Sequence, residues 1–185
     1  TDDCDRPYRR VVLLSLTDEQ TLEALAAAGA QENLVSPPLT TDHLIRTKSL
    51  PLWLDALPWV EPEALRARVT EAVQEYCVAY REYAARHEAA LPPGMEFFDP
   101  RPRAVLVPGV GALCAGPDLH EAIITRDITA HTVAVKALVA ETAAVAAPVP
   151  APGAGSGDSG GAAVPGGAAL PGAYRGLPEA ELFKM

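Results

Sequence analysis

The densest group of side chains able to bind an anion lies at residues 41–48, which read TDHLIRTK. Arg46 and Lys48 are two residues apart, with His43 and two threonines nearby. Guanidinium and ammonium groups donate charge-assisted hydrogen bonds to phosphate and carboxylate oxygens. His43, Arg46 and Lys48 are therefore candidate substrate-binding residues. The alternative is a solvated loop in which Asp42 caps a helix.

A second candidate is the glycine turn PGVG at residues 108–111, between an expected strand and an expected helix. It is only faintly similar to a phosphate-binding loop, because the third glycine of GxGxxG and the GK[ST] signature are missing. Asp118, at the start of the following helix, would compete with an anion for the free N–H groups. The favoured interpretation of Gly109 and Gly111 is a tight structural turn.

The sequence offers no obvious metal ligands and no catalytic nucleophile. His120 and His131 share a helix face, but they lie roughly 16 Å apart along the axis at 1.5 Å per residue. Cys77 and Cys114 sit in apolar surroundings, which predicts buried, inert thiols. We therefore expect no metal site and no catalytic residue from this chain. The histidines form no HxH, HxxxH or HxxE pattern: His43, His87, His120 and His131.

Apolar runs and turn residues predict the elements that must position these side chains. The clearest helix starts at Glu61, while residues 42–54 mix charged and apolar side chains and stay undecided. The expected fold class is α/β, a small mixed α/β domain with two long helices. Strands are predicted over residues 10–16, 104–108 and 112–115, and helices over 18–28, 61–89 and 118–146.

Two helix starts and one helix face can be predicted in more detail. Thr17, with Gln20 three residues later, predicts a capping box, and Asp118 predicts the cap of the last helix. In that helix the apolar residues Ile124, Ile128, Val135 and Leu138 follow helical spacing. His131 falls on the same stripe, so we expect it to be buried or half-buried.

The overall composition limits the possible partners. The chain has 185 residues, room for about one domain, and a formal charge of −9. An acidic chain without a basic cluster is a poor binder of nucleic acid or anionic membranes. No apolar run is long enough to span a bilayer, and no signal peptide is visible. Three cysteines without a disulfide framework favour a reducing, cytoplasmic location.

The chain divides into three predicted segments. Residues 1–147 hold the periodic patterns and predict the α/β domain. Residues 148–173 are half proline and glycine with a single charge, which predicts a flexible linker because little can be buried to offset chain entropy. Residues 174–185 predict a short helix-like segment that begins near Pro178.

Four segments match a known pattern in order and rough spacing. Residues 41–52 resemble TPDHLIRTKxLPL, residues 99–111 resemble DPxPRVVLIPGxG, and residues 127–132 resemble ADIxxHTI. Residues 179–183 resemble an acidic-aromatic segment that precedes a dehydrogenase domain. Together they resemble bifunctional proteins that join a class II, rhamnulose-1-phosphate-type aldolase to a short-chain alcohol dehydrogenase.

The resemblance implies the segment between two catalytic units, with residues 1–147 similar to the C-terminal part of the aldolase region. The intact family would cleave a ketose 1-phosphate to dihydroxyacetone phosphate and lactaldehyde, then oxidise the aldehyde. It implies a divalent metal (zinc) and NAD, with their ligands outside this chain. Separate catalytic aldolase and dehydrogenase domains are the implied partners. Thr41 replaces a usual Pro and Pro117 a common Lys, which removes a cation near the turn.

A non-catalytic scaffold or oligomerisation domain is the alternative. In it, the apolar stripe of the last helix with His131 would pack against another subunit, and the alanines at 137, 140, 143 and 144 would permit close approach. A decayed gene product is a third possibility.

Overall fold

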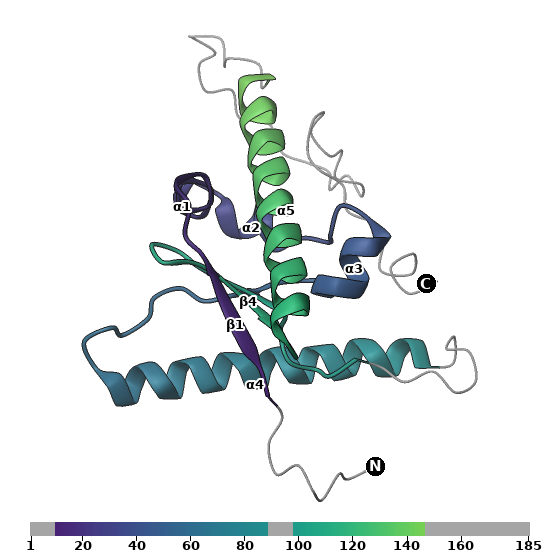
Figure 1. The fold of residues 1–185 in the computed structure, drawn as a ribbon. Coiled ribbons are helices and arrows are strands. Elements are labelled where there is room, and N and C mark those ends of the chain that lie inside the picture. Colours follow the sequence, from purple (N-terminus) through teal and green to yellow (C-terminus); the bar gives the residue numbers. More distant parts are fainter. Residues whose placement is uncertain (1–9, 89–97, 147–185) are drawn as a thin grey trace, which may run out of the picture.

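The computed structural model describes residues 10–88 and 98–146, and every structural statement below refers to them (Figure 1). These residues lie within the predicted domain at 1–147. The predicted linker at 148–173 and the predicted segment at 174–185 fall outside the described residues.

A four-stranded mixed sheet forms the centre of the domain, in the order β1-β4-β3-β2. β3 and β4 form an antiparallel hairpin, β1 pairs antiparallel with β4, and β2 pairs parallel with β3. The strands are β1 (Val12–Leu16), β2 (Leu52–Trp53), β3 (Ala104–Val107) and β4 (Gly111–Gly116). The undecided segment 42–54 thus ends in an edge strand.

Helices cover the two faces of the sheet unequally. The long helix α5 (Leu119–Ala146) crosses β1, β3 and β4, and it also contacts α1 (Glu19–Ala26) and α2 (Ala30–Leu34). The second long helix, α4 (Pro62–His87), contacts the sheet at β2. In Figure 1 the two long helices run crosswise, and α5 continues beyond the sheet. The predicted mixed α/β class with two long helices is confirmed.

Alternation along β3 divides the core into two clusters, because successive strand residues face opposite sides of a sheet. Leu106 is 1% exposed and packs with residues of α1, α2 and α5, including Leu25 and Val133. Val107 packs instead with α4 residues such as Ala72. β3 therefore anchors both helical layers.

The start of α1 differs from the prediction by one residue. Asp18, not Thr17, is the N-cap: its carboxylate accepts hydrogen bonds from the backbone N–H of Thr21 (3.0 Å) and from the Thr21 hydroxyl (2.8 Å). A carboxylate next to Thr17 provides the stronger acceptor for the free N–H groups. Asp118 does cap α5, accepting from the backbone N–H of Glu121 (2.9 Å).

The buried face of α5 also differs from the predicted stripe. Val135 is only half-buried, Leu138 is 60% exposed, and His131 is exposed rather than buried. Threonines can face the sheet because their hydroxyls bond within the helix, as Thr129 does to the carbonyl of Thr125 (2.7 Å). The buried residues of α5 recur at helical spacing: Ala122, Thr125, Thr129, Val133 and Lys136.

Candidate functional site

The predicted anion-binding segment forms a short helix, α3 (Thr41–Thr47), that packs on α5. Its N-cap is Thr40, whose hydroxyl accepts from the backbone N–H of His43 (3.3 Å). Its C-cap is Lys48, which has a positive φ of 67°. This turn separates the side chain of Lys48 from those of the helix before it.

Arg46 has a protein partner. Its Nη1 donates to both carboxylate oxygens of Glu121 on α5, at 2.9 Å each. The side chains are 44% and 25% exposed, respectively, so solvent reaches this ion pair. An anionic ligand at Arg46 would therefore have to compete with a carboxylate that is already in place.

Lys48 is buried, with 3% of its surface exposed. Its Nζ donates to the carbonyl oxygens of Asp99 and Arg101 (2.6 Å for the latter) and lies 4.2 Å from the centroid of the Tyr80 ring. Burial is the main cause that lowers the pKa of this amine, to about 8. Lys48 thus joins the end of α3 to the segment before β3 and to α4.

His43 lies against His131 of α5. The ring centroids are 5.9 Å apart and the planes meet at 84°, an edge-to-face arrangement. Burial lowers the pKa of His43, and the neighbouring His131 lowers it further. Nδ1 of His43 is buried and has no hydrogen-bond partner among the described residues. The neutral imidazole is therefore the favoured form.

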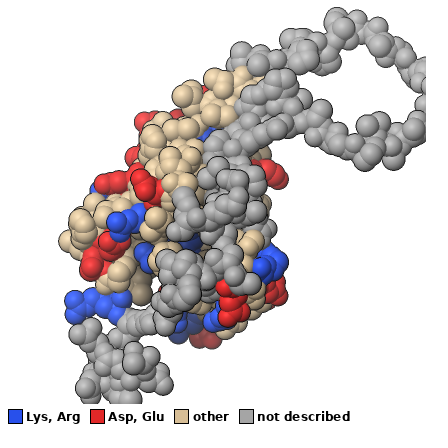
Figure 2. Space-filling model, turned by 90° about the vertical axis from the view of Figure 1, so that its right-hand side faces the viewer, with Lys and Arg blue, Asp and Glu red and all other residues tan. Residues whose placement is uncertain are grey.

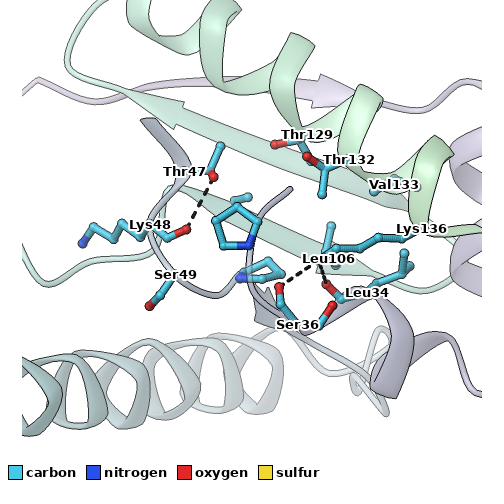
Figure 3. A pocket seen from close by; sticks show the side chains of 13 residues that line it. Leu34, Ser36, Thr47, Lys48, Ser49, Leu106, Thr129, Thr132, Val133 and Lys136 are labelled. Carbon is cyan, nitrogen blue, oxygen red and sulfur yellow. Dashed lines mark hydrogen bonds between the residues drawn. The ribbon is translucent and has the colours of Figure 1, made fainter. Parts of the chain in front are cut away.

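The three predicted binding residues do not converge on one point. His43 and Arg46 both face α5, where His131 and Glu121 meet them. Lys48 points elsewhere, toward the carbonyls at 99 and 101. In the close view of Figure 3, the side chain of Lys48 extends away from the small cavity that its backbone helps to line.

A second buried amine was missed by the sequence prediction. Lys136 of α5 is 3% exposed, and its Nζ donates to the carbonyls of Ser36 (2.8 Å) and Leu34 (3.3 Å), as Figure 3 shows. Burial lowers its pKa to about 8. The signal was its spacing, because Lys136 follows Thr129 and Val133 on one helical face. The adjoining cavity of about 30 Å³ has the size of a water molecule, which is too small for a sugar phosphate.

The glycine turn joins two antiparallel strands rather than a strand to a helix. Gly109 and Gly111 have φ of 77° and 123°. A Cβ on Gly111 would overlap the carbonyl oxygen of Leu16, while the space around Gly109 is open. The glycines therefore serve the hairpin and its contact with β1, and the turn does not open a helix N-terminus to a phosphate.

The divalent metal implied by the resemblance would need a cluster of ligating side chains. No group of three or more His, Cys, Asp or Glu side chains in the described part of the chain could hold a metal ion. Cys77 and Cys114 are free and buried, as predicted, and burial raises the pKa of the Cys114 thiol to about 11. The raised pKa keeps the Cys114 thiol protonated at neutral pH, so this thiol is not activated as a nucleophile.

An apolar groove of about 680 Å³ lies between α4 and the segment around β2. Its aromatic lining residues are Trp53, Tyr76, Tyr80 and Tyr83. The hydroxyl of Tyr76 donates a hydrogen bond to the carbonyl of Leu50 (2.7 Å). On the face shown in Figure 2, the visible acidic and basic side chains are interspersed. The lining of the groove is mostly apolar, and Glu75 and Arg86 are its charged side chains. Among the described helices, none is long and apolar enough to cross a membrane.

Comparisons with known proteins agree with the aldolase resemblance. Residues 2–151 match the family described as "Aldolase class II, second domain". Over 95 residues the chain is 26% identical to the "Uncharacterized oxidoreductase YuxG" of Bacillus subtilis (strain 168). The aligned region covers 51% of this chain and 13% of that protein. No solved structure matches significantly. The chain belongs to the family of class II aldolase second domains.

Proposed function

We propose that this chain is an accessory domain of an enzyme that combines a class II aldolase with an oxidoreductase, and that it is inactive alone. The main support is the family match over residues 2–151. In addition, the described residues contain no group of three His, Cys, Asp or Glu side chains that could hold a metal ion. Class II aldol chemistry needs a metal to polarise the substrate carbonyl. The partners would be the catalytic aldolase and dehydrogenase domains, which would carry zinc and NAD.

The proposed reaction of the intact enzyme is cleavage of rhamnulose 1-phosphate followed by oxidation of lactaldehyde, in the cytoplasm. The test is a coupled assay of the purified chain with rhamnulose 1-phosphate, with and without added Zn²⁺. We expect dihydroxyacetone phosphate to form no faster with the chain than without protein. Turnover by the chain alone would overturn the proposal.

We further propose that Arg46, with His43 beside it, contacts the substrate phosphate. Lys48 would not contact the phosphate but would support the site by holding the segment before β3. The exposed Arg46–Glu121 pair gives this idea a two-sided test. In titrations, dihydroxyacetone phosphate should bind more weakly to the Arg46→Ala variant than to wild type. It should bind more tightly to the Glu121→Gln variant, because this substitution frees the guanidinium of Arg46. Arg66→Ala on α4 is the control. Equal affinity in all four proteins would remove Arg46 from the site.

The second candidate function is a scaffold or oligomerisation domain. It is favoured by a groove of about 700 Å³ between α1 and the second half of α5, lined by small residues that include Ala134 and Ala137. Small side chains let a further helix approach closely. Leu138→Lys would fill this groove's rim with charge, so loss of self-association in that variant would support the groove as the contact.

A further inference from the structure

One edge of the sheet is left open in the described structure. β1 pairs with β4 along its whole length, from Val12 opposite Gly116 to Leu16 opposite Ala112. No described strand pairs with its other edge. In Figure 1, β1 is visible along its whole length, with no other described element drawn across it. Its outward N–H and C=O groups are therefore available to a further strand.

The two edges of the sheet are protected to different degrees. The opposite edge, β2, has only two residues, follows Pro51 and precedes Asp55 by one residue. β1 reads VLLSL, with no charge, no proline and no bulge. Leu13 within the strand is 58% exposed, and Val11 just before it is 56% exposed. Natural edge strands usually carry a charge, a proline or a bulge that prevents pairing, and β1 carries none.

We propose that β1 pairs antiparallel with β1 of a second copy of this chain, about a two-fold axis at Leu14. This pairing would join the two sheets into one of eight strands. Val12 would lie opposite Leu16 of the second copy, and Leu13 opposite Ser15. Each strand residue gains a partner without a like-charge contact, and the exposed Leu13 is covered. The inference does not rest on the proposed function.

Charge at the ends of the strand supports this register. Arg10 and Asp18 lie four residues before and four residues after Leu14. Antiparallel pairing about Leu14 therefore places Arg10 of each copy opposite Asp18 of the other copy. Both residues are exposed. The hydrogen bonds from Thr21 lower the pKa of Asp18, so this carboxylate stays ionised. The dimer would therefore carry an opposite-charge pair at each end of the shared ladder.

The competing contact surface lacks such complementarity. The groove between α1 and α5 is lined by Glu23 and Glu141, and by no lysine or arginine. Two copies of this groove would present only acidic charges to each other, so the lining offers no opposite-charge pair between them. β1 is thus the better-supported surface for a second copy.

The test is sedimentation velocity of the full chain over a concentration series, with circular dichroism to show that each variant is folded. Leu13→Lys places a charge in the shared ladder and should weaken the dimer at least tenfold. Arg10→Glu replaces attraction with repulsion and should weaken it several-fold, less so at high salt. Leu138→Lys and Arg66→Glu make matching charge changes elsewhere and should leave the dimer unchanged.

Hydrogen exchange supplies a second readout. Amides of residues 12–16 should exchange more slowly as protein concentration rises, while those of α4 should not change. A chain that is monomeric at every concentration would overturn the proposal. So would a dimer that is lost in Leu138→Lys, or one that neither Leu13→Lys nor Arg10→Glu weakens.

Discussion

The face of the sheet under α5 and the face under α4 differ in how completely they are covered. α5 contacts β1, β3 and β4 and, with α1 and α2, buries Leu106 and Ala112 to about 1% exposure. On the other face, α4 covers the β2–β3 half, and Leu13 of β1 stays 58% exposed. The covered face stabilises the domain, whereas the open half and the adjoining edge are available for contacts with other proteins or copies.

The largest expected effect contrasts one leucine from each face. Leu106→Ala removes a fully buried side chain and should lower the free energy of unfolding by about 2–5 kcal/mol. Leu13→Ala should change it by about 0.5 kcal/mol or less, because the side chain is mostly exposed in the monomer. Urea denaturation of dilute protein measures both. Equal losses would mean that the α4 face is covered as well as the α5 face.

The next effect concerns the turn that joins β3 to β4, where Gly111 lies next to Leu16 at the end of β1. Gly109→Ala has open space and should cost about 1–2 kcal/mol for its positive φ alone. Gly111→Ala should cost more, by roughly 1–3 kcal/mol, because its Cβ would also overlap the backbone of Leu16. Thermal denaturation of the two variants gives the order, and a Gly109 variant less stable than the Gly111 variant would contradict it.

Lys136 makes the α5 face sensitive to alkaline pH. Its pKa is about 8 when folded and about 10.5 when unfolded, so the unfolded state binds more protons between these values. Stability contributed by this group therefore rises with pH across that window. Between pH 7.5 and 9.5, wild type should gain about 1–2 kcal/mol relative to Lys136→Met, measured by urea denaturation. Parallel pH profiles would show that folding does not lower the pKa of Lys136.

The smallest effect concerns the histidine pair between α3 and α5. The pKa of His43 is lowered in the folded state, so its stability contribution is lost as pH falls below about 6.5. His131→Asn removes one cause of that shift and should reduce the acid loss by about 0.5 kcal/mol or less. Melting at pH 7.5 and 5.5 compares it with His120→Asn, an exposed change on the same helix. The idea fails if the two variants behave alike.

The sequence predicted the elements better than their contacts. The helix starting near Glu61, the hairpin strands and the Asp118 cap followed from periodicity and capping, which are local properties. The 42–54 segment stayed undecided because a seven-residue helix and a two-residue strand depend on packing. The buried face of α5 was misassigned because apolarity was taken as the signal, while threonines satisfied within the helix and Lys136 are buried instead.

The candidate site was predictable in composition but not in geometry. The cations of residues 43–48 were found by type, yet their partners Glu121 and His131 lie more than 70 residues away in the chain. The separation of Lys48 from Arg46 depends on a positive φ at residue 48, which no side-chain pattern indicates. Arg46 and Lys48 were therefore predicted to bind one ligand, whereas their side chains contact different parts of the fold.

The complete burial of Cys114 has a practical consequence. Its thiol sits in β4 with 0% exposure, and burial raises its pKa to about 11. An alkylating reagent that needs an accessible thiolate can react only after β4 separates from its neighbours. The rate at which Cys114 is labelled therefore measures how often the packing around β4 opens.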